Sequence, residues 1–440
     1  MNKEDLNKTL NLTDIVKEYK SIKKKDKKNV IYRILPEIFI PALIVLSVIS
    51  SHSKLLIFEP LNYVIFGLLV IFSIIFIVGL FKYKKIISTQ IDTIFKSLVC
   101  IYSIGCTVFL LMLYLPNSGF KSWLISTAMS TMNHQYLCKW FYNDKEIKLV
   151  LDSNYIKEVD EETDTSLIDV EKEEVIEYAN EYERAVLERE EDAKYKIIEL
   201  NVNGQKGYLA AIYDPSKVHV GTTAAVGSYG QYVTKQAERY GAVLAINGGG
   251  FYDPGHSSTG GSPTGVTISN GKVVTNNTYG IYTQGGGIIG FDANNTLHLI
   301  KGSNYSKARE VGIRDAVTWG PFLIVNGKKS FISGNGGWGY AARTAIGQRA
   351  DGIVLMLTVD SNATRTKGAS MVDLTEIMYN YGAINAANLD GGTSTVMVLP
   401  KEEANKYREC YDNYCYINDP IDGALRHKTR GVATSFYVSE

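Results

Sequence analysis

The sequence predicts an α+β fold whose main domain is a mixed or mainly antiparallel sheet with few helices, preceded by three transmembrane helices and an acidic helical stalk. Three observations lead to this prediction. Long apolar stretches lie in the first quarter of the chain, a run rich in Glu and Asp follows, and the remainder alternates short apolar segments with Gly, Asn, Asp and Pro turns. We therefore expect a basic tail at 1–33, a membrane anchor at 34–115, an acidic linker or stalk at 116–194 and a globular domain at 195–440.

The charge balance limits the kind of partner. Among 440 residues, Lys and Arg total 46 and Asp and Glu also total 46, so the formal net charge is zero. A protein that binds a polyanion is expected to carry a basic excess. We therefore expect no nucleic-acid partner.

Three apolar stretches, at 34–50, 61–81 and 98–115, are the expected transmembrane helices. The second is as long as the roughly 20 residues that cross a bilayer core, and the other two are near the short end of the range. Lysines cluster before the first stretch and between the second and third. The positive-inside rule then puts the N-terminus in the cytoplasm and everything after about Pro116 outside the cell membrane. A cleaved signal peptide is the alternative, but the first stretch lies too far from the start of the chain.

The segment 158–192 is dominated by Glu and Asp. Its second half, 170–192, contains helix-forming residues with interspersed apolar ones, which indicates a solvated or coiled helix. We interpret the segment as a charged spacer that separates the globular domain from the membrane.

The remainder reads as short strands with two helices. Residues 196–202 alternate apolar and polar side chains, and Asn270-Gly271 is typical of a hairpin tip. Helices are expected near 231–240 and 371–381, where apolar residues recur at helical spacing. Because strands outnumber helices and do not alternate with them, a parallel doubly wound sheet is disfavoured.

The stretch 388–395 carries the strongest chemical signal. Asp390 stands between an apolar run and the pair Gly391-Gly392. A strand that ends in such a sharp turn projects a carboxylate and backbone N–H groups into one small space. Asp360 also follows an apolar strand, so the two carboxylates are expected near one sheet edge, where they would divide acid and base roles or bind a hard cation.

Two further segments add polar groups. Residues 245–254 form a strand that runs into three glycines, with Asn247, Gly248 and Asp253 as candidates. The glycines would allow close approach of a ligand, or a turn would require them, and both alternatives are open. Arg343 begins an apolar segment and would grip an oxyanion, with a salt bridge to Asp360 or Asp390 as the alternative.

Several other positions carry weaker signals. The stretch 319–327 is predicted to be a strand ending in a turn. Histidines are scattered, which argues against a His-rich two-metal site, and His256 in a Gly/Ser loop is a candidate lid residue. Cys410 and Cys415 would form a small disulfide in an extracellular domain, and reduced thiols are the equal alternative.

In this order, the segments around Asn247, Arg343, Asp360 and Asp390, with Arg430 before Gly431-Val432-Ala433, resemble the phosphodiester glycosidase family over about residues 200–440. Two positions differ from the family pattern in ways that bear on the phosphate contacts and on the sugar accepted: Ser361-Asn362 replaces Gly-Arg, and Thr393 replaces a third glycine. The resemblance implies Asp390, Asp360 and Asn247 as catalytic residues and Arg343, Arg430, Gly248, Gly391, Gly392 and Ser394 as substrate-binding residues. Asp253, which follows the three glycines, is added to the substrate-binding set from the residue pattern alone.

The resemblance implies a hydrolase that cleaves the sugar C1–O bond of an N-acetylglucosamine-like sugar-1-phosphodiester. With the anchor expected from the apolar stretches, we expect a membrane-anchored extracellular enzyme acting on a cell-surface glycan. The alternative is a catalytically inactive module that binds phosphate-bearing cell-wall or exopolysaccharide glycans. A phosphodiesterase that breaks the P–O bond is disfavoured. No cofactor is certain; a divalent cation such as calcium is open, with Asp360, Asp373 and Asp390 as candidate oxygen ligands.

Overall fold

The computed structural model describes residues 119–129, 135–170, 177–253, 259–278, 285–362, 367–421 and 429–440, with single positions between 67 and 114. It contains two compact units, one formed by residues up to 128 with 134–148 and one by 129–133 with 149–440. The first contains helices α5 (Gly119–Met129) and α6 (Gln135–Lys139) and the start of α7 (Asp144–Ser153).

The predicted fold class was wrong in part. The described chain is mostly β-sheet with few helices, and every strand pairing in it is antiparallel. Within the described ranges, every helix is too short or too polar to cross a bilayer. The predicted span 34–50 lies outside the described residues, and only scattered positions of 61–81 and 98–115 fall inside them.

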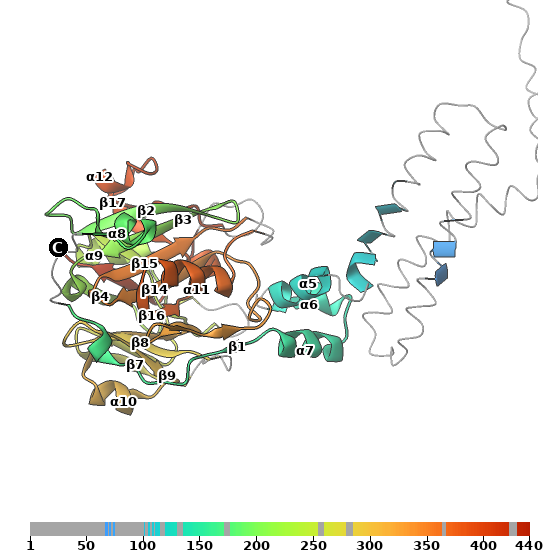
Figure 1. Cartoon of the computed structure of the whole chain (residues 1–440), viewed down its shortest axis with the longest axis horizontal. Coiled ribbons are helices and arrows are strands. Elements are labelled where there is room, and N and C mark those ends of the chain that lie inside the picture. Colours follow the sequence, from blue (N-terminus) through green and yellow to red (C-terminus); the bar gives the residue numbers. More distant parts are fainter. Residues whose placement is uncertain are drawn as a thin grey trace, which may run out of the picture. The chain divides into compact units, whose positions relative to one another are not determined.

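The second unit is built on four sheets, which Figure 1 shows with β7, β8 and β9 on one side and β2, β3 and β17 on the other. A seven-stranded sheet has the order β12-β11-β16-β14-β15-β3-β2, and two five-stranded sheets have the orders β18-β17-β5-β19-β4 and β7-β6-β10-β8-β9. The fourth is the pair β1-β13. The strand bounds are β1 (Ile156–Lys157), β2 (Tyr195–Val202), β3 (Gln205–Ile212), β4 (Val218–Thr222), β5 (Leu244–Asn247), β6 (Val266–Ser269), β7 (Lys272–Asn276), β8 (Gly287–Asp292), β9 (Leu297–Lys301), β10 (Ile313–Trp319), β11 (Phe322–Val325), β12 (Lys328–Lys329), β13 (Phe331–Ile332), β14 (Arg343–Arg349), β15 (Val354–Val359), β16 (Ala383–Asn388), β17 (Met397–Pro400), β18 (Tyr414–Tyr416) and β19 (Thr434–Val438).

The core lies where the three large sheets meet. Ile346 of the seven-stranded sheet, Phe436 of one five-stranded sheet and Phe291 of the other are fully buried in one cluster. The opposite face of the seven-stranded sheet is covered by helix α11, whose Leu374 and Met378 belong to a second buried cluster. Because both faces of the sheet are buried, β11 (FLIV) and β15 (VLMLTV) read as nearly continuous apolar runs.

The helices are short. Besides those named above, the second unit has α8 (Glu181–Leu187), α9 (Val233–Tyr240), α10 (Tyr305–Glu310), α11 (Met371–Asn380) and α12 (Lys401–Ala404), with single 3₁₀ turns at Thr165–Leu167, Pro215–Lys217 and Gly392–Ser394. The helices expected near 231–240 and 371–381 are confirmed as α9 and α11, and the Asn270-Gly271 hairpin joins β6 to β7.

The acidic segment is not a helical stalk. Its only helix between 177 and 192 is α8, and Val186 of that helix is fully buried in the cluster beneath the seven-stranded sheet. Upstream, Glu158 accepts hydrogen bonds from the backbone N–H groups of Gly286 and Phe322 at 2.7 and 2.6 Å. The high density of charge suggested a solvated spacer, but a few apolar and hydrogen-bonding side chains among the acids fix the segment to the domain.

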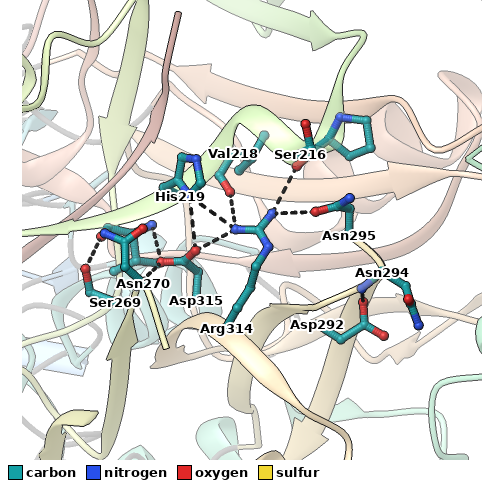
Figure 2. A network of polar contacts seen from close by, with 12 residues as sticks. Ser216, Val218, His219, Ser269, Asn270, Asp292, Asn294, Asn295, Arg314 and Asp315 are labelled. Carbon is teal, nitrogen blue, oxygen red and sulfur yellow. Dashed lines mark hydrogen bonds and ion pairs between the residues drawn. The ribbon is translucent and has the colours of Figure 1, made fainter. Parts of the chain in front are cut away.

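A polar cluster connects the two five-stranded sheets (Figure 2). Arg314 on β10 donates to Asp315 at 2.5 Å and to the carbonyl of Val218 at 2.8 Å. The fully buried carboxylate of Asp315 in turn accepts from the N–H of Val220 on β4 and contacts His219 Nδ1 at 3.2 Å. Paired and hydrogen-bonded in this way, the buried charges are compensated, and the cluster fixes β4 against β10.

Candidate active site

Asp390 lies at the turn after β16, where the chain leaves the seven-stranded sheet. Its carboxylate accepts from the N–H of Gly391 at 3.0 Å and from Nη2 of Arg430 at 3.2 Å. The side chain is 10% exposed, whereas that of Arg430 is 38% exposed. Gly392 has φ of 63°, a backbone conformation that favours glycine and lets the turn reverse sharply. The turn thus presents one carboxylate at the edge of the core beside one accessible guanidinium.

The backbone of Asp390 is gripped on both sides by the end of β5. Asn247 Nδ2 donates to the Asp390 carbonyl at 2.6 Å, and the Asp390 N–H donates to the Gly248 carbonyl at 3.2 Å. Asn247 Oδ1 accepts from Thr344 at 2.8 Å and from the N–H of Val396 at 3.2 Å. With its amide used in this way and fully buried, Asn247 positions the Asp390 turn.

The three glycines after Asn247 are required by packing. A Cβ on Gly248 would lie 2.6 Å from Thr434 Oγ1, and one on Gly250 would lie 1.8 Å from the Trp319 ring. A Cβ on Gly249 would lie 2.7 Å from the Thr318 carbonyl. Of the two alternatives that the sequence left open, close packing against β10 and β19 accounts for these glycines.

Arg430 connects the turn to two neighbours. Its Nε donates to Ser394 Oγ at 2.7 Å, and its guanidinium lies over the Phe251 ring, 4.7 Å from the ring centre. Ser394 itself is fully buried within the 3₁₀ turn that follows Gly391. Three segments that are distant in sequence thus converge at one point: the end of β5, the stretch from the end of β16 through the 3₁₀ turn, and the stretch before β19.

Arg343 begins β14 beside the same turn. It is 5% exposed, and its Nη2 donates to the carbonyls of Trp338 and Gly339 at 2.5 and 3.0 Å. A Cβ on Gly391 would lie 3.8 Å from Arg343 Nη1. The guanidinium is therefore fixed next to Asp390 by backbone carbonyls of the loop that precedes its own strand.

Asp360 belongs to a different hydrogen-bond set. Its two carboxylate oxygens accept from Asn418 Nδ2 at 2.8 Å and from the N–H of Asp419 at 2.9 Å. Burial raises the pKa of Asp360 above its ordinary range, against the lowering effect of these two bonds. Asn418 also donates to the carbonyl of Thr395, so Asp360 supports the strand that follows the Asp390 turn.

The remaining candidates are placed as follows. Asp253 is partly exposed beyond Phe251, and His256 lies outside the described residues. Asp373 caps α11 by accepting from the N–H of Ser370 at 2.7 Å. The three carboxylates considered as cation ligands therefore occupy separate hydrogen-bond sets, and the described ranges contain no group of three His, Cys, Asp or Glu side chains suited to a metal ion.

Sequence reasoning missed Thr344 and Asn418. Thr344 lies inside the Arg343 motif, and alternation along β14 would have placed its hydroxyl on the face opposite Arg343. Asn418 lies in an irregular loop after β18, where no local pattern marks it. Both are buried hydrogen-bonding residues, and through Thr395 and Asn247 they connect the carboxylate of Asp360 to the backbone carbonyl of Asp390.

Comparison with known proteins identifies the region. Residues 240–439 match the family model for phosphodiester glycosidases. The SPbeta prophage-derived uncharacterized protein YomE of Bacillus subtilis is 27% identical over 237 residues, which is 50% of this chain and 35% of that protein. The chain thus spans about a third of the length of this relative.

Two solved structures are also similar. The catalytic domain of zebrafish N-acetylglucosamine-1-phosphodiester alpha-N-acetylglucosaminidase, auto-inhibited by its pro-peptide, has a TM-score of 0.43 and 19% identity, covering 58% of this chain and 87% of that one. A putative exported protein of Burkholderia pseudomallei has a TM-score of 0.38 and 16% identity, covering 54% and 74%. The family match covers residues 240–439, just under half of the chain, so this region is similar to phosphodiester glycosidases.

Proposed function

We propose that this chain hydrolyses the C1–O bond of an N-acetylglucosamine-like sugar-1-phosphodiester in a glycan outside the cytoplasm. The observation that carries the proposal is the contact of 3.2 Å between the carboxylate of Asp390 and the guanidinium of Arg430. It brings together the two charges that this reaction needs, a carboxylate for the sugar and a cation for the phosphate.

The leaving group explains why one carboxylate suffices. A phosphodiester oxygen is a much weaker base than an alcohol oxygen, so its departure needs less protonation and more positive charge. A guanidinium has five N–H donors. Within the described residues two of those of Arg430 bind Ser394 and Asp390, which leaves donors for phosphate oxygens. Arg343 also lies close to Gly391 and supplies a second positive charge.

Asp390 is the proposed base. It takes a proton from a water molecule whose oxygen bonds to C1, and the electron pair of the broken C1–O bond remains on the phosphate oxygen. The products are the free sugar and a phosphomonoester on the acceptor. Asp360 is assigned no step because both of its oxygens accept hydrogen bonds from Asn418 and Asp419.

The location outside the cytoplasm is supported by the disulfide between Cys410 and Cys415, because disulfides persist in oxidising compartments. The partner that we propose is a glycan carrying phosphodiester-linked sugar. The chemistry of the site does not discriminate between cell-wall glycans and exopolysaccharides, since both would offer the same sugar-phosphate linkage.

The test incubates the full chain with N-acetylglucosamine-1-phosphate diesters of simple alcohols and quantifies free sugar and sugar phosphate. We expect free sugar, lost by about 10³-fold or more in Asp390→Asn and by about 10²- to 10³-fold in Arg430→Ala. Arg184→Ala, which removes an exposed ion pair with Glu188, is the matched control and keeps its rate.

Three results would contradict the proposal. Sugar phosphate as the product would indicate P–O cleavage. Unchanged turnover in Asp390→Asn would remove that residue from the mechanism. Binding of phosphate-bearing glycan without any product would indicate an inactive binding module.

A further inference from the structure

A short segment upstream of the family match contacts two separate parts of the domain, the loop before β14 and the start of β11. We name residues 153–158 the strap. It contains β1, which pairs in antiparallel register with β13 so that Ile156 lies opposite Ile332. Two of its polar side chains, Asn154 and Glu158, turn toward the domain, and each accepts hydrogen bonds from backbone N–H groups of a different loop.

The Asn154 end fixes the loop that holds Arg343. Asn154 is 7% exposed, and its Oδ1 accepts from the N–H of Asn335 at 3.1 Å. Three residues farther along this loop, the carbonyls of Trp338 and Gly339 accept from Arg343 Nη2. The position of the Arg343 guanidinium therefore depends on a loop that the strap anchors.

The fit between strap and loop is close. A Cβ on Gly334 would lie 2.2 Å from Asn154 Oδ1, and one on Gly336 would lie 2.8 Å from Ile156. Both glycines also have positive φ, at 58° and 69°. The loop has thus been shaped around the strap, because a side chain at either position would displace it.

The Glu158 end fixes the start of β11. One carboxylate oxygen, Oε1, accepts from both Gly286 and Phe322. Burial raises the pKa of Glu158, against the lowering effect of these two N–H bonds. Glu158 therefore acts as a hydrogen-bond acceptor. A glutamine at this position, which has a neutral amide of the same shape, would accept the same two hydrogen bonds.

Hydrogen bonds connect the residues just before β11 to the Asp390 turn. The carbonyls of Gly320 and Pro321, just before Phe322, accept from Asn388 Nδ2 at 2.7 Å and from the Asn388 N–H at 3.0 Å. Asn388 ends β16, two residues before Asp390. The two ends of the strap thus lead to Arg343 and Asp390, two of the three charged residues proposed to act on the substrate.

We propose that Glu158 and Asn154 are positioning residues for Asp390 and Arg343, so that the active site is completed by a segment outside the family-matched region 240–439. This inference rests on the proposed function. Misplacing a catalytic group by about 1 Å can lower a rate by about 10²-fold, so removing either anchor should affect catalysis at temperatures where the protein is still folded.

The experiment compares Glu158→Ala, Glu158→Gln and Asn154→Ala in the full chain, with Asp160→Ala as the matched control. Asp160 is an exposed acid just beyond the strap and pairs with Lys301 at the surface. Steady-state kinetics with the diester are combined with hydrogen exchange of segments 333–343 and 385–394, at a temperature where circular dichroism shows each variant folded.

We expect Glu158→Ala to lower kcat by about 10- to 100-fold with KM changed less than about threefold, and Glu158→Gln to restore most of the rate. Asn154→Ala is expected to raise KM by about tenfold, because Arg343 is assigned to phosphate binding. Exchange should accelerate at 385–394 in Glu158→Ala and at 333–343 in Asn154→Ala, and Asp160→Ala should change neither.

Other results would overturn the inference. Unchanged kinetics in folded Glu158→Ala would reduce the strap to a stabilising element, and higher activity would make it an inhibitor of the site. A Glu158→Gln variant as impaired as Glu158→Ala would show that charge, and not hydrogen-bond geometry, is required. If the wild-type chain cleaves no diester while the exchange pattern is as expected, the proposed function fails and the positioning role stands.

Discussion

Replacing Asn247 with Ala separates a catalytic role from a positioning role. In the structure this buried amide makes three hydrogen bonds, to the Asp390 carbonyl, the Thr344 hydroxyl and the Val396 N–H. After the change Thr344 still has Thr395 Oγ1 at 3.3 Å, so two buried backbone groups lose their partner. At about 1 to 3 kcal/mol for each orphaned group, the expected loss of unfolding free energy is about 2 to 6 kcal/mol.

The assay is urea denaturation with a thermal scan. For a domain of this size, 1 kcal/mol corresponds to roughly 2 to 4 °C, so we expect the melting temperature of Asn247→Ala to fall by about 10 °C. The control is Asn294→Ala in an exposed loop, which should change stability by less than about 0.5 kcal/mol. A melting temperature that is unchanged while activity is abolished would refute the positioning role and make Asn247 a catalytic residue.

Three further predictions concern the domain around the site. A fragment beginning at Tyr195 should melt well below the full chain in a thermal scan, because it lacks both the strap and the buried α8; an equal melting temperature would show that residues 149–194 are dispensable. Burial disfavours the charged form of Asp292, but hydrogen bonds from His298 and from backbone N–H groups outweigh it and hold its pKa below the ordinary value. The resulting stability is present above about pH 4 and is lost as the pH falls through the depressed folded-state pKa, so urea titrations should show a shallower acid slope for Asp292→Asn than for wild type, and equal slopes would refute this. Cys410→Ser opens a loop of five-residue separation and should lower the unfolding free energy by about 2 kcal/mol in urea, with no change if the reduced loop keeps its conformation.

The turn at Asp390 was predictable because its signal is local. An apolar strand, an acid and two glycines define a turn whatever surrounds them, and the structure places Asp390 at the end of β16 as expected. The convergence of Asn247 and Arg430 on that turn followed from the resemblance, since no local pattern indicates which strands pair.

Other features depend on tertiary packing, and the sequence pattern did not predict them. The run of acids at 158–192 has the composition of a solvated spacer, yet Glu158 and Val186 are buried in the domain. Asp360 and Asp390 both follow apolar strands, but their carboxylates have different partners: Asn418 donates a hydrogen bond to Asp360, and Arg430 donates one to Asp390. Such assignments depend on loops that approach from distant parts of the chain, which sequence periodicity does not encode.

The order β18-β17-β5-β19-β4 has a consequence for synthesis of the chain. The last of the described strands to be synthesised, β19, inserts between β4 and β5, which are made about 200 residues earlier. Until then these two strands expose unsatisfied edges, the kind of surface that chaperones and proteases recognise. Arg430 immediately precedes β19, so a chain truncated ahead of this residue lacks both the closing strand and the guanidinium beside Asp390. We therefore expect a chain truncated ahead of Arg430 to lose the proposed activity and the pairing of β4 and β5 with β19 together.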